Sequence, residues 1–391
     1  MYADKEYIIS ARRRLHEYPE LGFDLPKTIA FVKNELDAIG VEYSEQYGKS
    51  SIVAVINPDK TNFTIGIRAD MDALPINEIN DIPYKSKHEG KMHACGHDAH
   101  TAMLLGTAKA LYAMRDKLSC RVKLLFQPSE EGFTSGAMEM VKHGVMDDID
   151  VIIGLHVENW LESGKIGVCP GASMASSRSI KIEIFGKCAH ATLPESGNDA
   201  LAAAVTTYNS IQTMLTRTIS PFAKYVCSVG KLTAGKTQNI VPDYAEMLLT
   251  VRTFDMEVDK HIDTAIREIA NASAQSFGCT AKVNSDLKTV VVYNDPYISK
   301  LVLESARKAV GEDNIVGMPK KMSSEDFSHY LTKKPGVFFR LGTRNIEKGC
   351  TTLPHNDNFM IDEDALVSGS NTCVQFVLDN MNGIEFKAMG Q

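Results

Sequence analysis

Apolar segments of the strand type alternate with helical segments in the first part of the chain, and this alternation restricts the possible folds more than any other feature. Each apolar segment has the length of a buried strand and is too short to span a membrane. The order strand–helix–strand–helix–strand predicts an α/β domain with a mainly parallel sheet. The predicted strands lie at 51–56, 63–70, 121–126 and 151–156, and the predicted helices at 4–18, 26–40, 99–113 and 136–144.

Polar residues that could bind a ligand stand at the ends of these predicted strands. In open α/β sheets, ligands bind beyond the carboxyl ends of the strands. We therefore expect the following side chains to meet at one edge of the sheet: Asp70 and Asp72, Glu130 and Glu131, and His156.

The segment MHACGHDAH, Met92 to His100, is the densest cluster of potential metal ligands. Thiolate, imidazole and carboxylate groups bind first-row transition metals. Cys95 and His97 point the same way only if the backbone between them is extended, so we expect a loop at 92–97. Asp98 is available to cap the helix that follows. The alternative is a polar loop whose histidines make ordinary hydrogen bonds.

The sequence pattern changes from about Ser177. The following segment has the β-α-β-β-α-β order of a ferredoxin-like domain. We expect residues 178–287 to form a second domain, inserted into a first domain that comprises residues 1–177 and 288–391. After the insert, the apolar strand GVFFRLG precedes the loop LPHNDNF, so that His355 also lies beyond a strand end.

The candidate ligands are too numerous for one catalytic zinc ion, which usually has three protein ligands. They suit two metal ions that share a water. Because Glu130 and Glu131 are adjacent and cannot easily point the same way, one would bind metal and the other would act as general base. Alternatives are a Cys95–His97 nucleophilic dyad, a structural zinc site and a simple charged turn. The full set is Cys95, His97, Glu131, His156 and His355, with Glu130 as the further carboxylate.

Composition argues against several classes of function. The 391 residues carry a net charge of −7, which disfavours nucleic acid or an anionic membrane as the main partner. We expect neither a signal peptide nor a membrane anchor, and no GxGxxG follows the early strands as in a dinucleotide site. The eight cysteines are scattered, as in proteins with reduced thiols, so we expect a cytoplasmic protein. The run Arg12–Arg14 is expected on a solvated helix face.

A series of motifs gives the chain a recognisable identity. It resembles the N-acyl-amino-acid amidohydrolases, a branch of the co-catalytic metallopeptidases that includes hippurate hydrolase, indole-acetyl-amino-acid hydrolases and N-acetyldiaminopimelate deacetylase. The resemblance covers nearly the whole chain. Its motifs are RRRLHEYPELGF, IRADMDALP, MHACGHDAHTAMLLG, LLFQPSEEG, IIGLHV, GKCAHATLPESGNDA, TQNIVPDYAEM, TVRTF, SSEDFSHYL and LPHNDNF, in that order.

The resemblance implies a role for each candidate residue. Glu130 would be the general base, and Asp72 would orient a ligand or that base. Asp70 stands where related dimetal peptidases have a histidine ligand, which leaves its role open. The insert would be a lid and dimerisation domain. Two divalent metal ions would be bound by Cys95, His97, Glu131, His156 and His355, and the substrate carbonyl or carboxylate by His190, Asn239 and Arg252.

Ordinary structural roles remain for two of these residues: His190 could cap a turn, and Arg252 could form a salt bridge along an exposed strand. Ser323–Ser324 differs from the glycine that the family has before the aspartate, and this loop is expected to border the acyl pocket.

We therefore expect a hydrolase of linear amides that removes the acyl group from small N-acyl amino acids and forms a homodimer or a higher homo-oligomer through its lid. The metals would be zinc or manganese, with cobalt and nickel as alternatives. A dipeptidase or carboxypeptidase with the same dimetal machinery is the alternative enzyme. A non-catalytic metal-binding protein is the alternative from another class, and the intact Glu130 argues against it.

Overall fold

The computed structural model describes residues 2–385, and the chain divides into two compact units. The first unit comprises residues 1–171, 293–319 and 326–391, and the second comprises residues 172–292 and 320–325. The second unit thus contains the predicted insert, 178–287, together with a short segment from much later in the chain.

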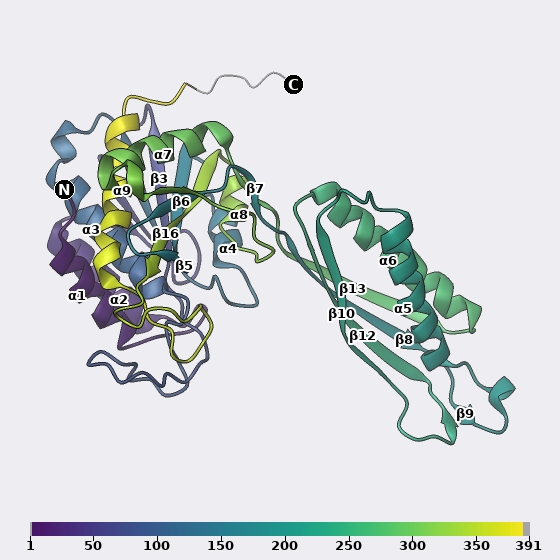
Figure 1. Cartoon of the computed structure of the whole chain (residues 1–391). Coiled ribbons are helices and arrows are strands. Elements are labelled where there is room, and N and C mark those ends of the chain that lie inside the picture. Colours follow the sequence, from purple (N-terminus) through teal and green to yellow (C-terminus); the bar gives the residue numbers. More distant parts are fainter. Residues whose placement is uncertain (1, 386–391) are drawn as a thin grey trace. The chain divides into compact units, whose positions relative to one another are not determined.

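The first unit is built on an eight-stranded sheet in the order β1-β2-β4-β3-β5-β16-β6-β15. Figure 1 labels β3, β5, β6 and β16 of this sheet. Its centre, from β4 through β3 and β5 to β16, is parallel, whereas β1, β2 and β6 make antiparallel contacts. The predicted α/β fold with a mainly parallel sheet is confirmed. The strands are β1 (Glu42–Ser44), β2 (Ile52–Ile56), β3 (Thr64–Asp70), β4 (Arg121–Gln127), β5 (Val151–Glu162), β6 (Ile166–Val168), β15 (Ile315–Gly317) and β16 (Gly336–Arg344).

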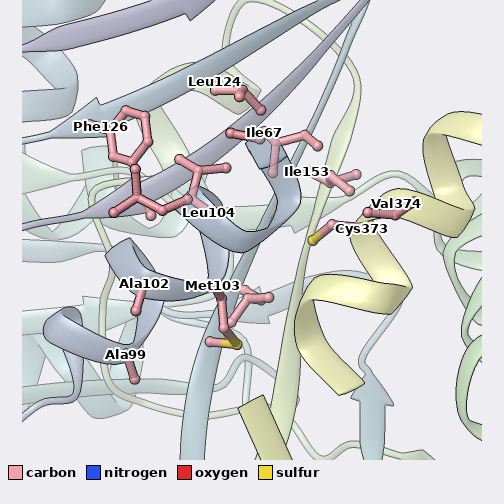
Figure 2. Close-up of a cluster of buried hydrophobic side chains, with 14 of the residues drawn as sticks. Ile67, Ala99, Ala102, Met103, Leu104, Leu124, Phe126, Ile153, Cys373 and Val374 are labelled. Atoms are coloured by element: carbon pink, nitrogen blue, oxygen red, sulfur yellow. The ribbon is translucent and has the colours of Figure 1, made fainter. Parts of the chain in front are cut away.

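Helix α3 (His97–Ala113) lies at the centre of the main core and packs against α1, α9 and the sheet. Figure 2 shows side chains of α3 together with side chains of the sheet and of α9 in this core. Small residues allow this close packing: a Cβ at Gly106 would lie 2.5 Å from Ile8 of α1. The predicted helices at the N-terminus are present, and α2 begins at a proline and ends at Gly40, as its sequence indicates. The helices are α1 (Lys5–His16), α2 (Pro26–Ile39), α4 (Gly136–Lys142), α7 (Pro296–Val310), α8 (Ser328–Leu331) and α9 (Leu366–Asn380).

One expectation about the helices is wrong, and a second is wrong in part. Asp98 does not cap α3, because the N-cap is Gly96 and Asp98 lies inside the first turn. Asp98 instead accepts a hydrogen bond from His16 Nδ1 at 2.7 Å and pairs with Arg12 Nε at 2.8 Å. Arg12 is consequently only 2% exposed, whereas Arg13 and Arg14 are exposed, as expected for the run. Arg12 is buried because α1 packs on α3, so that the inner face of α1 meets the buried carboxylate of Asp98.

Strand β5 also continues past the predicted end at His156. It runs to Glu162 because β16 pairs with it over this length, from Gly336 with Ile152 to Arg344 with Glu162. His156 therefore lies within the strand and not beyond it.

The second unit is a four-stranded antiparallel sheet, in the order β10-β12-β8-β13, with two helices. Its elements follow the β-α-β-β-α-β order, and its own apolar core forms between the sheet and both helices. Within residues 2–385, no helix has both the length and the apolar character of a membrane span. The elements are β8 (Ser177–Phe185), α5 (Ala200–Arg217), β10 (Tyr225–Ala234), β12 (Tyr244–Thr253), α6 (Met256–Ser276) and β13 (Thr280–Thr289), with the short pairs β9 (Ala189–His190) and β11 (Ile240–Val241), and β7 (Gly171–Met174) and β14 (Val292–Asn294).

Candidate metal centre

A tight turn before α3 presents two of the predicted ligands. Gly96 separates Cys95 from His97 and has a φ of +84°, a conformation that favours glycine. A Cβ at this position would also lie 2.4 Å from Val157 Cγ2. The close approach of the turn to β5 thus requires glycine, and it leaves Cys95 and His97 beside His156.

The five predicted ligands come together in overlapping groups. Cys95 Sγ lies 3.3 Å from His156 Nε2, and Glu131 Oε1 lies 3.0 Å from His355 Nε2. Ligand atoms lie within 4.8 Å of one another in the group Cys95, His97 and His156 and in the group Cys95, Glu131 and His355. Cys95 belongs to both groups. A third group combines His97 with Glu130 and Glu131.

Asp72 holds the loop that carries the two glutamates. Its Oδ1 accepts a hydrogen bond from Glu130 N at 2.9 Å, and its Oδ2 accepts one from Glu131 N at 3.0 Å. The preceding residue, Ser129, has a φ of +52°, which is uncommon for a residue other than glycine. Asp72 Oδ1 also lies 3.4 Å from His97 Nδ1. One carboxylate therefore contacts a candidate ligand and both glutamates.

The histidines at the centre are suited to bind a metal ion. His156 Nδ1 donates a hydrogen bond to Val157 O at 2.6 Å, which leaves Nε2 as a lone-pair donor beside Cys95. Burial is the main cause that lowers the pKa of His156 well below its usual value. His97 is fully buried, and neither of its ring nitrogens makes a hydrogen bond within the described part of the chain. Buried polar atoms rarely lack a partner, so the donor set fits a metal ion.

Anionic neighbours shape the electrostatics of this centre. Burial would lower the pKa of His97, but Asp70 and Asp72 outweigh it, and this pKa is raised well above its usual value. Hydrogen bonds with a thiol and a carboxylate raise the pKa of His355 to about 10. Both shifts mean that the surroundings favour positive charge, which a bound cation would also supply.

His100, in the same motif, has an ordinary structural role. Its Nδ1 donates to Asp70 Oδ1 at 2.6 Å, and its Nε2 accepts from Val157 N at 2.9 Å. Both nitrogens are thus used, so His100 is not a free ligand, although it lies within 4.8 Å of Asp70 and His97. Asp70, whose role the sequence left open, binds His100 and also Arg68, at 2.6 Å from Nη1. Sequence reasoning missed Arg68, whose charge inside an apolar strand was the available signal.

The three predicted substrate-binding residues all belong to the second unit. His190 is exposed and pairs across β9 and β11 with Ile240, next to Asn239. Arg252 lies on β12, where its Nη1 donates to Ser324 Oγ at 2.8 Å and burial lowers the pKa of its guanidinium. His190 and Asn239 are therefore neighbours, and Arg252 contacts the Ser323–Ser324 segment.

Comparisons with known proteins agree with this geometry. The model of peptidase family M20/M25/M40 matches residues 66–379. The chain is 36% identical to thermostable carboxypeptidase 2 of Saccharolobus solfataricus, covering 94% of this chain and 93% of that one. It is 37% identical to N-acetyl-L-cysteine deacetylase of Bacillus subtilis, covering 94% and 86%.

A solved structure agrees as well. A dinuclear metal-binding peptidase of the M20 family from Bacillus subtilis superposes with a TM-score of 0.82 at 33% identity, covering 97% of this chain and 99% of that one. The resemblance seen in the sequence motifs is thereby confirmed, and the chain belongs to peptidase family M20/M25/M40.

Proposed function

We propose that this protein is a metal-dependent amidohydrolase that releases amino acids from small N-acyl amino acids. The observation that carries the proposal is the overlap of two ligand groups at Cys95, with Glu130 beside them. The predicted enzyme class, a hydrolase of amide bonds, is confirmed by the family and by relatives named as a deacetylase and as carboxypeptidases.

The proposed cofactor is a pair of divalent metal ions. Such ions activate a water at neutral pH and polarise the scissile carbonyl. Zinc suits the thiolate of Cys95, and manganese, cobalt and nickel are alternatives. The residues that would hold the ions are Cys95, His97, Glu131, His156 and His355.

Glu130 is the proposed general base. The hydrogen bond from its backbone to Asp72 fixes the start of the loop, so that its carboxylate stays beside His97 and Glu131. In this position Glu130 takes a proton from the attacking water and passes it to the leaving amine. Asp72 contributes by holding the loop and by its contact with His97.

The insert is proposed to recognise the substrate and to join two copies of the chain. His190, Asn239 and Arg252 offer neutral and cationic donors for the free α-carboxylate of the amino acid, either in their own chain or in the partner of a homodimer. We also propose that the protein works in the cytoplasm.

A comparison of substrates tests the proposed function. N-Acetyl and N-benzoyl amino acids should be hydrolysed, and chelator or the Cys95→Ala substitution should abolish their turnover. Converting the substrate carboxylate to a carboxamide should cost at least ~2 kcal/mol in kcat/KM, the scale for losing a charged hydrogen-bond partner. Equal cleavage of acid and carboxamide would indicate a general amidase instead.

A carboxypeptidase or dipeptidase is the second candidate, favoured by the carboxypeptidase relatives. Including dipeptides in the same assay distinguishes the two, because the preferred substrate has the higher kcat/KM. Metal binding without turnover of any of these compounds would point to a non-catalytic protein.

A further inference from the structure

A buried arginine outside the ligand set, Arg68, joins two parts of the candidate metal centre. Its neighbours on β3, Ile67 and Ala69, belong to the main core, so the side chain of Arg68 points to the opposite face of the sheet. There its guanidinium carbon lies 5.9 Å from the ring centroids of both Phe327 and Phe338. A fully buried charge requires partners for its charge and its donors.

The partners of Arg68 include two carboxylates and one amide. Its Nη1 donates to Asp70 Oδ2 at 2.6 Å, and its Nη2 donates to Asp326 Oδ1 at 2.9 Å. Its Nε donates to Gln127 Oε1 at 2.7 Å. The planar guanidinium therefore fixes the positions of two carboxylates, one on each side.

Asp70 connects Arg68 with the first turn of α3. Besides the hydrogen bond from His100, its main-chain oxygen accepts one from Thr101 Oγ1 at 2.7 Å. Its Oδ2 lies 3.8 Å from His97 Nε2. Asp70 thus fixes the helical turn that carries the candidate ligand His97.

Asp326 connects Arg68 with the far end of the glutamate loop. Its Oδ2 accepts hydrogen bonds from Ser135 Oγ at 2.6 Å and from Ala137 N at 3.2 Å, at the start of α4. A carboxylate oxygen of Asp326 also lies within 4.8 Å of one from Glu130. Asp72 holds the loop at Glu130 and Glu131, and Asp326 holds it where α4 begins.

We propose that Arg68 and Asp326 are positioning residues that keep the turn of His97 and the loop of Glu130 and Glu131 at the separation needed to bind metal. This inference rests on the proposed function, because it assigns a metal to these residues. In this proposal neither Arg68 nor Asp326 is a metal ligand; each acts through the residues that it holds.

Zinc binding to the metal-free, full-length chain tests the inference without any substrate. Asp326→Asn replaces one acceptor oxygen by a donor that faces Ser135 Oγ and Ala137 N. Arg68→Lys keeps the charge but loses the fork that spans both carboxylates. Competition with a chromophoric chelator should show zinc affinity weakened about 10- to 100-fold in both variants, the range for residues that orient metal ligands.

Arg178→Lys is the matched control. Arg178 lies on β8 in the second unit, is buried, and pairs with Asp259 at 2.6 Å. Its replacement by lysine therefore removes the same kind of arginine–aspartate contact. The control should lower the melting temperature of the metal-free chain about as much as Arg68→Lys while leaving zinc affinity unchanged. Zinc affinities of Asp326→Asn and Arg68→Lys no weaker than that of Arg178→Lys would overturn the inference.

Activity gives a second, separate readout. In Asp326→Asn, kcat should fall about 10-fold or more at saturating zinc while KM stays near the wild-type value, a split that a general loss of folded protein does not produce. If the wild-type chain hydrolyses no N-acyl amino acid, the proposed function fails, whereas the zinc affinities still decide the positioning role.

Discussion

At the scale of single residues, Asp72 holds the loop that carries two adjacent glutamates, Glu130 and Glu131, for which we propose different roles. Asp72 accepts hydrogen bonds from both backbone amides, which fixes the loop, and a carboxylate oxygen of Glu130 lies within 4.8 Å of one from Glu131. Glu131 lies 3.0 Å from His355, and Glu130 joins Glu131 and His97 in a separate group. We infer that Glu131 binds metal and that Glu130 handles the proton.

Substitution of each glutamate by glutamine tests this division. Glu131→Gln should lose metal, measured as ions per chain. Glu130→Gln should keep its metal and a near-normal KM while kcat falls by roughly 10²-fold or more, as the loss of a general base implies. Equal metal loss in the two variants would show that the roles are wrongly divided.

Asp362 is a residue whose charge should stabilise the fold. Its side chain is only 4% exposed and accepts hydrogen bonds from Ser163 Oγ at 2.7 Å, Asn345 Nδ2 at 2.8 Å and Lys348 Nζ at 2.6 Å. Burial would raise the pKa of Asp362, but these donors outweigh it and lower the pKa. The ionised form of Asp362 is therefore favoured in the folded chain. Its contribution to the free energy of unfolding is present above about pH 3.9, the pKa of aspartate in an unfolded chain, and is lost as the pH falls through the lower pKa of the folded chain.

The Asp362→Asn variant should be less stable by ~1–3 kcal/mol at pH 7, because the three donors around this buried side chain lose a charged acceptor. The difference in melting temperature between wild type and variant should shrink from pH 6 to pH 3, as the wild-type carboxylate becomes protonated. Asp59→Asn, at an exposed position, is the control and should match wild type at both pH values. A difference that does not change with pH would remove the ionised Asp362 as its cause.

At the scale of elements, the turn between Cys95 and His97 decides the geometry of the centre. Gly96 combines a positive φ with a position too close to Val157 for any side chain. The turn also begins α3, so a shift at Gly96 would move His97 relative to His156 on β5.

Gly96→Ala should therefore weaken metal binding and lower the melting temperature, both by strain and by the contact with Val157. Gly164→Ala is a matched control, because Gly164 has a φ of +82° and a Cβ there would meet no atom within 4 Å. The control should lose only ~1–2 kcal/mol of stability, the cost of backbone strain in the left-handed conformation, and should bind metal normally. Equal metal affinities in the two variants would show that the turn tolerates a side chain.

At the scale of the whole molecule, the second unit has surfaces suited to a second copy of the chain. The strands β10 and β13 are the two edges of its sheet within the described residues. On α5, Leu201, Val205 and Tyr208 are 39%, 45% and 39% exposed at helical spacing. Sheet edges and apolar stripes of this kind pair readily, which supports the proposed homodimer.

Mixing two inactive variants tests whether His190 acts across such a dimer. In a heterodimer of His190→Ala and Glu130→Gln subunits, one of the two sites has an intact Glu130 and a partner with an intact His190. Random pairing should then restore about one quarter of the wild-type activity. If mixed dimers form, as shown by differently tagged subunits, and no activity returns, His190 acts in its own chain or serves only the structure.

The sequence by itself determined the α/β class, the parallel centre of the sheet and the residues gathered at the candidate centre. Apolar periodicity and polar residues at strand ends are local properties, and parallel strands place such ends at one edge regardless of loop details. His355 was found in this way although it lies far along the chain from Cys95.

Only the tertiary structure decided which charged residues are buried and with which partners. Arg12 was predicted to be solvated, but the packing of α1 on α3 buries it beside Asp98. Arg68 binds Asp326, which lies 258 residues away in the sequence. No local pattern specifies such a pair, because a buried charge is stable only where packing excludes water and supplies a counter-charge at the same point.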